Sequence, residues 1–172
     1  ILLTYSFDPL FFEQVVHRDL RAGGTTECVV VADQNSVDDV LGRVAGQLTW
    51  LGRSYRVNFP SVNSRQHAKL ILRAGQSGAL VWIGSGNLTY GGWGKNQELA
   101  SAWTVNSDDT ESVFLFSELL EQLRSILQDD ALRTLEKVMS LTWVARGTAS
   151  SSFKRGVMLS GPGRTLSEQL GE

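Results

Sequence analysis

A continuous apolar run at residues 27–32 constrains the fold of this chain more than any other feature of its sequence. After Glu27 it contains Cys28 and three consecutive valines, with no further polar residue before Asp33. Such a run is typical of a strand that is buried on both faces, which occurs where helices cover both sides of a parallel sheet. The run therefore predicts a core strand and favours an α/β fold.

The segments around this run alternate between strands and helices. Residues 1–6 read as a core strand, and Asp8 then caps a helix that has Pro9 at its first position. Apolar side chains recur at helical spacing over residues 12–20 and again over residues 37–48. The order strand–helix–strand–helix predicts an α/β domain whose first strands are parallel.

The middle of the chain predicts further strands, and two helices follow them. A turn signal at residues 75–78 separates two of these strands and predicts a hairpin. Apolar stripes over residues 113–127 and 132–139 predict helices that cover one face of the sheet. The expected middle strands lie at residues 54–59, 66–73, 79–85 and 97–104. The predicted fold class is α/β, with a mixed, largely parallel sheet flanked by helices.

The composition changes near residue 146. Small polar residues fill positions 147–152, which is typical of a linker. Residues 157–160 then resemble the opening strand in type, and a helix-like stretch follows them as it follows residues 1–6. We therefore assign residues 1–145 to one domain. We interpret residues 146–172 as a linker and the start of a second, similar domain, with chance similarity as the alternative.

Charge and cysteine content limit the partners and the compartment. The chain has 172 residues, with 16 Lys and Arg against 18 Asp and Glu, and a formal net charge of -2. Nucleic-acid binders often carry a large positive excess, so positive charge for such a role must be local or come from other parts of the protein. The single cysteine, Cys28, excludes an internal disulfide and fits a reducing cytoplasm. We see neither a transmembrane run nor a secretory signal.

His67 and Lys69 are the first candidates for a functional site. They lie two positions apart on a predicted strand, so both side chains should point to the same face of the sheet. The lysine supplies positive charge, and the histidine can attack or transfer protons near neutral pH. The pair is therefore suited to bind an anion and to take part in a reaction on it.

A second group of candidates follows the next predicted strand. Gly84 and Gly86 flank Ser85, which lets the backbone approach a ligand closely, and Asn87 comes two residues after the serine. Ser85 and Asn87 both offer hydrogen-bond donors to the non-bridging oxygens of a phosphate. Glu98, at the start of another apolar strand, can fix the tautomer of a nearby histidine and stabilise its protonated form.

These segments, taken in order, resemble the signature of the phospholipase D superfamily, His-x-Lys followed by Gly-Ser-x-Asn and a downstream Glu. The segments are His67-Ala68-Lys69, Gly84-Ser85-Gly86-Asn87-Leu88-Thr89 and Asn96-Gln97-Glu98. The superfamily includes phospholipases, nucleases, phospholipid synthases and a DNA-end repair enzyme. The chain departs from the pattern at Ala74, where the family usually has an aspartate that is thought to serve the fold more than the chemistry.

The resemblance implies catalysis without a metal or another cofactor. His67 would attack phosphorus and form a phosphohistidine intermediate. Lys69, Ser85 and Asn87 would bind the phosphate oxygens, and Glu98 would orient a histidine. A second histidine, from a second copy of the motif, would protonate the leaving oxygen. Because this chain holds one His-x-Lys, it should form half of a site, completed by an identical chain in a two-fold dimer or by a second domain of a longer chain.

The substrate and two aromatic residues leave alternatives open. We expect a nuclease acting on DNA or other nucleic acid, because compact one-motif units of the superfamily are often nucleases and no membrane-binding feature appears. The alternatives are a phospholipase or phosphatidyl transferase, and a non-catalytic domain that uses the phosphate pocket for binding or assembly.

Tyr90 and Trp93 either stack on a base or pack locally. His17 is assigned to the surface of the first helix.

Overall fold

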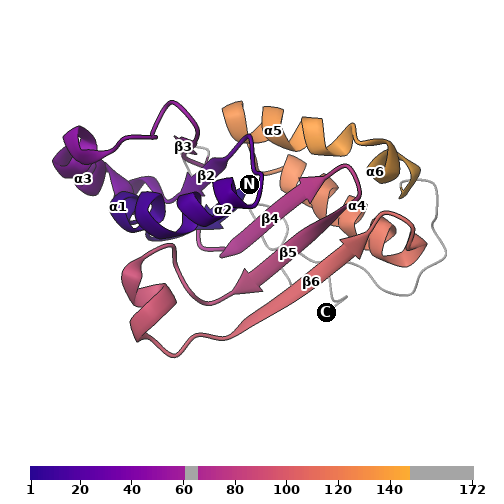
Figure 1. Cartoon of the computed structure of the whole chain (residues 1–172), viewed down its shortest axis with the longest axis horizontal. Coiled ribbons are helices and arrows are strands. Elements are labelled where there is room, and N and C mark those ends of the chain that lie inside the picture. The colour runs from indigo at the N-terminus through magenta and orange to yellow at the C-terminus, as the bar shows by residue number, and fades with distance from the viewer. Residues whose placement is uncertain (61–65, 148–172) are drawn as a thin grey trace.

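One six-stranded sheet organises the molecule (Figure 1). The computed structural model describes residues 1–60 and 66–147. The strands lie side by side in the order β3-β2-β1-β4-β5-β6. Their bounds are β1 Leu2–Thr4, β2 Val29–Ala32, β3 Arg56–Asn58, β4 Leu70–Gly75, β5 Gly78–Gly84 and β6 Ala100–Asn106. The core strand predicted at residues 27–32 is β2, which is buried along its whole length.

The sheet is mixed but mostly antiparallel. The two pairings among β1, β2 and β3 are parallel, whereas β1 with β4, β4 with β5, and β5 with β6 are antiparallel. The α/β class is therefore confirmed, and the expectation of a largely parallel sheet is wrong. The reason lies in the connections. Only two residues, Gln76 and Ser77, join β4 to β5, and so short a link cannot carry the chain across to a parallel neighbour.

Helices flank the sheet as predicted. One continuous helical stretch is formed by α1 Pro9–Phe11, the π-helical segment η1 Phe12–His17, and α2 Arg18–Ala22. Its start agrees with the sequence, because the Asp8 side chain accepts a hydrogen bond of 3.0 Å from the Phe11 N–H. The remaining helical elements are α3 Gln34–Val44, η2 Ala45–Gln47, η3 Gly91–Lys95, α4 Thr110–Arg124, α5 Asp129–Met139 and α6 Thr142–Gly147.

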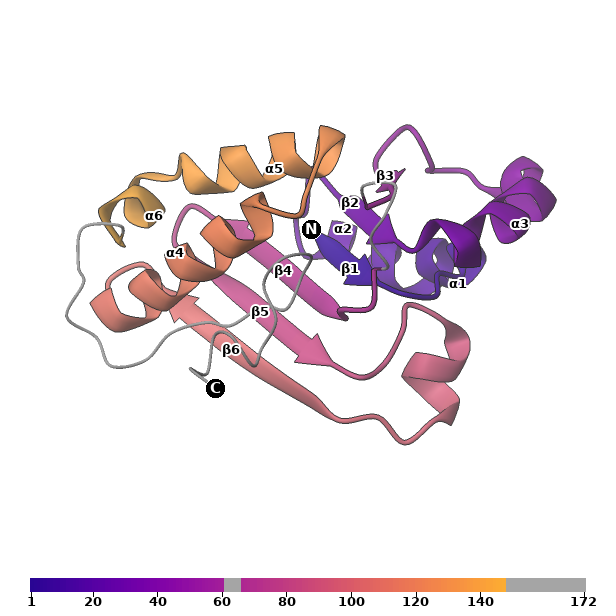
Figure 2. The ribbon, with the colours of Figure 1, turned by 180° about the vertical axis from the view of Figure 1, so that it is seen from behind.

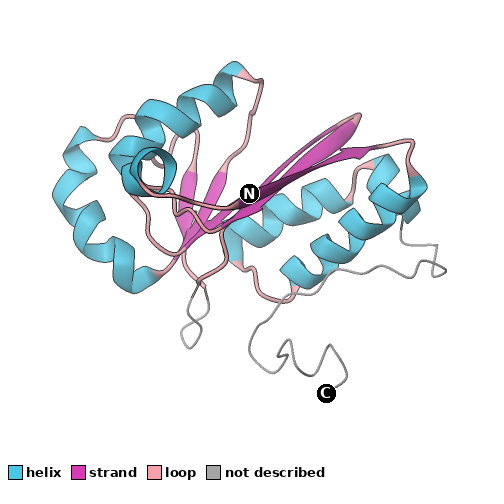
Figure 3. Cartoon of the chain, turned by 90° about the horizontal axis from the view of Figure 1, so that it is seen from below, coloured by secondary structure: helices cyan, strands magenta, loops and turns pink. Residues whose placement is uncertain are grey.

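Two hydrophobic cores lie on the two faces of the sheet, and Figures 2 and 3 show the helices on either side. Helices α4, α5 and α6 cover one face, where Phe116 stacks on Trp143 at 5.4 Å between ring centroids. On the other face, the stretch from α1 to α2 packs Phe12 against Tyr55 at 4.9 Å. The linker and second-domain assignment of residues 146–172 falls, beyond Gly147, outside the described residues.

His17 lies in the second of these cores and not on the helix surface. It is 1% exposed, and its Nε2 lies 3.0 Å from Ser54 Oγ. Residues 12–17 are wound as a π-helix, in which hydrogen bonds join positions five apart. His17 therefore falls near the face that carries Phe12, whereas the α-helical spacing assumed from the sequence placed it outside.

Replacement of His17 by glutamine should flatten the acid dependence of stability. Burial, and then the positive charge of Arg21, lower the pKa of His17, so the folded state binds a proton less readily than the unfolded chain. Stability is then fully present above the unfolded value of about 6.5 and falls as the pH drops below it, by at most about 1.4 kcal/mol per pH unit. Urea unfolding between about pH 5 and pH 8 measures this slope. The control His67→Gln should keep it, and an unchanged slope in His17→Gln would contradict the assignment.

Candidate functional site

The sheet topology brings the predicted site residues to one edge. Strands β1 and β5 end at this edge, and β4 and β6 begin there because they run antiparallel to their neighbours. His67 and Lys69 come just before β4, Ser85 just after β5, and Glu98 just before β6. Residues far apart in the sequence therefore converge through the antiparallel half of the sheet. The predicted hairpin at residues 75–78 accounts for the pairing of β4 with β5, whereas the sequence did not predict the antiparallel pairing of β1 with β4.

His67 and Lys69 are in direct contact. The Lys69 ammonium donates a hydrogen bond of 2.8 Å to the His67 carbonyl, and its Nζ lies 3.1 Å from His67 Nδ1. Both residues precede β4, although the expected strand began at residue 66, and the Gly84 N–H donates to the Lys69 carbonyl at 3.1 Å. His67 is exposed and its ring lies 5.2 Å from that of Tyr5, whereas Lys69 is only 8% exposed. The pair thus joins an accessible imidazole to a sheltered positive charge.

Burial governs the charge of Lys69. It lowers the pKa of the ammonium, and the negative charge of Glu98 acts in the opposite direction. An ammonium that has lost much of its hydration is stabilised further by any anion that approaches it. Lys69 is therefore suited to bind a phosphate group beside His67.

Asn87 is held by the backbone that follows β1. Its Oδ1 accepts hydrogen bonds from the N–H groups of Tyr5, at 3.1 Å, and Ser6, at 3.0 Å. Its Nδ2 has no hydrogen-bond partner among the described residues. The sequence suggested Asn87 as a phosphate ligand, and no local signal pointed to its contact with a segment more than eighty residues earlier. The oxygen serves the fold, and the amide nitrogen is available to a ligand.

Ser85 and Glu98 form a hydrogen-bonded pair. The Ser85 hydroxyl donates to Glu98 Oε2 and accepts from the Leu99 N–H at 3.0 Å, while Asn96 Nδ2 donates to Glu98 Oε1 at 3.3 Å. Within the described part of the chain Glu98 makes no hydrogen bond to His67. Its predicted role in orienting a histidine therefore stays a prediction, and so does the binding of phosphate by Ser85.

Two glycines allow the loop after β5 to fold tightly on itself. A Cβ atom on Gly86 would lie 2.6 Å from the Gly92 carbonyl oxygen, and one on Gly92 would lie 2.4 Å from the Asn87 carbonyl oxygen. Both distances are shorter than any side chain tolerates. The backbone of Asn87 is thus fixed against η3, which follows it in the same loop.

Ala74 lies at the far end of β4, where the family usually has an aspartate. It pairs with Ala79 and packs against the core under α4. It comes five positions after Lys69, which is roughly 16 Å along the strand at the usual rise per residue. The alanine therefore lies far from His67 and Lys69.

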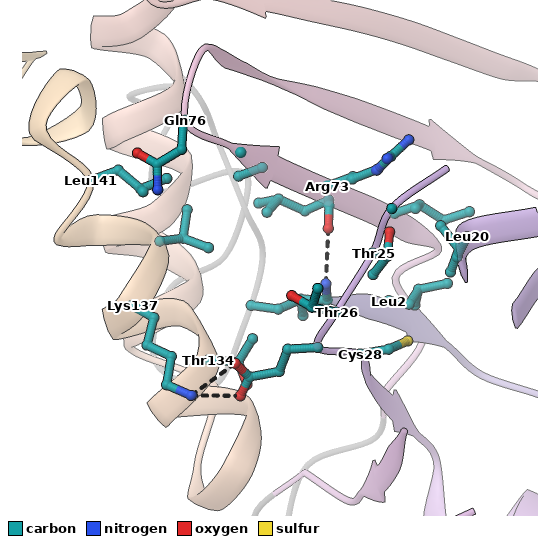
Figure 4. A pocket seen from close by; sticks show the side chains of 18 residues that line it. Leu2, Leu20, Thr25, Thr26, Cys28, Arg73, Gln76, Thr134, Lys137 and Leu141 are labelled. Atoms are coloured by element: carbon teal, nitrogen blue, oxygen red, sulfur yellow. Dashed lines mark hydrogen bonds and ion pairs between the residues drawn. The ribbon is translucent and has the colours of Figure 1, made fainter. Parts of the chain in front are cut away.

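A cavity of about 320 Å³ opens at the opposite edge of the sheet, where β1 and β2 begin and β4 ends (Figure 4). Two of its charged side chains are paired, since Lys137 Nζ lies 2.8 Å from Glu27 Oε2, and Thr134 donates to Glu27 Oε1 at 3.1 Å. A third, Arg73, donates a hydrogen bond to the Gly23 carbonyl. None of the residues that line this cavity belongs to the group of His67, Lys69, Ser85, Asn87 and Glu98 at the other edge, which we call the His67 cluster.

Among residues 1–60 and 66–147, no group of three or more His, Cys, Asp or Glu side chains could hold a metal ion. In these same ranges no helix has the length and apolar character to cross a membrane.

The comparisons with known proteins concern the fold. Neither a protein-family model nor a curated protein matches the sequence. Among solved structures, NucT from Helicobacter pylori superimposes with a TM-score of 0.42 at 15% identity, over 74% of this chain and 80% of NucT. Yeast tyrosyl-DNA phosphodiesterase also gives 0.42, at 12% identity, over 80% of this chain but only 34% of the yeast protein. Scores this low say nothing of the chemistry of this chain. Both of these solved structures are of proteins of the phospholipase D superfamily.

Proposed function

We propose that this chain is half of a metal-independent phosphodiesterase that acts on nucleic acid through a phosphohistidine intermediate. The observation that carries the proposal is the contact of Lys69 with His67, at the sheet edge that also holds Ser85, Asn87 and Glu98. An accessible imidazole beside a sheltered ammonium and an amide donor provides a nucleophile and ligands for the phosphate oxygens.

The reaction takes place in two displacements at phosphorus. In the first, a ring nitrogen of His67 gives its lone pair to phosphorus while the bond to the leaving oxygen breaks, and that oxygen takes a proton from a second histidine. In the second, water attacks phosphorus, the nitrogen–phosphorus bond breaks and returns its electron pair to His67, and the proton of the water passes to the second histidine. Lys69 and Asn87 Nδ2 bind the oxygens that carry negative charge in both transition states.

The second histidine must come from outside this sequence. The chain has two histidines, and the other one, His17, is packed among Phe12, Trp50 and Tyr55 in a hydrophobic core. A second copy of the chain, related by a two-fold axis through the site, supplies the missing group most simply. A similar domain in a longer protein would supply it equally well.

The test is hydrolysis of bis(p-nitrophenyl) phosphate in excess EDTA. We expect turnover without added metal, and a specific activity that rises with protein concentration if two chains complete the site. Labelled DNA and RNA oligonucleotides should then be cleaved, whereas phosphatidylcholine vesicles should release no head group. Turnover that appears only after a divalent cation is added would contradict the mechanism, and head-group release without cleavage of nucleic acid would favour a phospholipase.

The single histidine of the cluster favours a second candidate, a domain that binds phosphate without turning it over. Lys69 and Asn87 Nδ2 suffice for binding, whereas cleavage also needs an acid for the leaving group. Saturable binding of inorganic phosphate, with no hydrolysis at any protein concentration, would support this candidate over the enzyme.

A further inference from the structure

Two large aromatic side chains lie exposed in the loop that follows Asn87. Tyr90 is 61% exposed and Trp93 is 45% exposed, whereas Phe12, Tyr55 and Phe116 are almost fully buried. Burial of such rings is a main source of stability, so a neighbouring pair left in solvent indicates a surface that binds something. We refer to Tyr90 and Trp93 together as the aromatic platform.

The platform is supported from below and carries a positive charge. Phe11 lies beneath both rings, with centroids 6.5 Å from Tyr90 and 6.1 Å from Trp93, and Trp82 lies 6.2 Å from Trp93. Lys95 Nζ lies 5.9 Å from the centroid of the Tyr90 ring. The rings are thus held by packing while much of their surface stays open to solvent, next to a cation that can meet a phosphate.

The platform is fixed to the phosphate ligands by the backbone. Tyr90 follows Asn87 by three residues, so their Cα atoms are at most roughly 11 Å apart. Gly92, between the two rings of the platform, is packed against the backbone of Asn87. Figure 2 shows this connection between β5 and β6 beside the end of β1. A strand whose phosphate binds beside Asn87 therefore has its neighbouring bases within reach of the aromatic platform.

We propose that Tyr90 and Trp93 stack on unpaired bases next to the phosphodiester held at His67, so that the chain selects single-stranded over double-stranded nucleic acid. This inference rests on the proposed function. Flat rings bind every base by its face, whereas paired bases in a duplex are already stacked and present only their edges. Lys95 adds a contact to the sugar-phosphate backbone that passes over the rings.

A protein partner explains the platform less well. At 150–250 Å² for each ring, its exposed part amounts to roughly 200 Å². A stable protein interface buries about 800 Å² on each partner. The platform is therefore small for a dimer contact and of the right size for one or two bases.

The test is fluorescence anisotropy with three labelled probes, a thymidine oligonucleotide, the same oligomer with abasic sites throughout, and a duplex of equal length. All proteins carry His67→Ala so that the probes survive. We expect Trp93→Ala or Tyr90→Ala to weaken binding of the thymidine oligomer about tenfold, at the stacking energy of one base. Binding of the abasic oligomer should change less than about twofold, because that oligomer has no bases to stack on the rings. Trp93→Phe should recover most of the affinity, and Trp50→Ala, another exposed tryptophan packed on Arg21, should have no effect.

Each other outcome overturns the inference in a recognisable way. An equal loss for the thymidine and abasic oligomers would mean that the rings only shape the phosphate site. Preference for the duplex in the protein that carries only His67→Ala, or unchanged affinity when folded Trp93→Ala or Tyr90→Ala is added, would exclude stacking while leaving the phosphodiester site intact. Conversion of a dimer into a monomer by Trp93→Ala, seen by sedimentation, would assign the platform to a protein contact. If the protein that carries only His67→Ala binds no abasic oligomer, the proposed function fails together with this inference. Circular dichroism checks that each variant is folded. If Trp93→Ala unfolds, Tyr90→Ala, at the more exposed ring, takes its place in the binding test.

Discussion

Replacement of His67 by alanine should lower kcat/KM for bis(p-nitrophenyl) phosphate at least about a thousandfold, because loss of a covalent nucleophile removes the entire two-step route. The imidazole is exposed, and its contacts with Lys69 and Tyr5 are few, so the free energy of unfolding should change by no more than about 1 kcal/mol. A steady-state assay in EDTA and urea unfolding measure the two effects separately.

The covalent intermediate gives a second measurement of the same prediction. A nitrogen–phosphorus bond survives an alkaline quench and is broken by acid, so labelled substrate should remain attached to the wild-type chain and not to His67→Ala. His17→Gln is the matched control, because it removes the other histidine from a hydrophobic core away from the cluster. It should form the adduct at a temperature where it is folded. An adduct in His67→Ala, or activity within tenfold of wild type, would contradict the assignment of the nucleophile.

The parts of the fold that depend on local patterns could be predicted from the sequence. Asp8 caps its helix, residues 75–78 form the turn of a hairpin, and the apolar run at residues 27–32 contains the buried β2. Each of these features is decided by residues within a few positions of one another. Short-range rules were sufficient there because no distant partner changes the outcome.

The parts that depend on distant partners could not be predicted. The pairing of β1 with β4 is antiparallel, and the alternation of strands and helices in the first half gave no sign of it. The burial of Lys69 follows from that pairing, because the lysine enters the interior only once β4 lies between β1 and β5. The prediction that His17 lies on the helix surface failed for another reason. The π-helical winding of η1 changed the periodicity on which that prediction rested.

The candidate site shows the same division. The motif identified His67, Lys69, Ser85, Asn87 and Glu98, and the structure brings them to one edge of the sheet. The motif could not show that Ser85 is paired with Glu98, or that Asn87 accepts two backbone hydrogen bonds from the segment after β1. The side chain of Asn87 therefore combines a structural and a chemical task, one on each atom of its amide. That division leads to a prediction that separates the two.

Substitution of Asn87 should uncouple stability from activity. Asn87→Asp keeps oxygen acceptors for the N–H groups of Tyr5 and Ser6, so its free energy of unfolding should stay within about 1 kcal/mol of wild type. It replaces the Nδ2 donor by negative charge where the phosphate binds, and kcat/KM should fall at least about a hundredfold. Asn87→Ala leaves both N–H groups without their acceptor and should be destabilised by about 2–3 kcal/mol as well as inactive.

Asn106→Asp is the matched control for the added charge. Asn106 is the last residue of β6, at the opposite edge of the sheet, and its Oδ1 also accepts a backbone hydrogen bond, from the Asp108 N–H at 3.1 Å. The same chemical change there should leave both kcat/KM and stability near wild type. Urea unfolding and hydrolysis of the chromogenic diester are measured on all three variants. Activity in Asn87→Asp would show that Nδ2 does not bind the phosphate. An Asn87→Ala variant as stable as wild type would show that the contact with Tyr5 and Ser6 does not hold the loop.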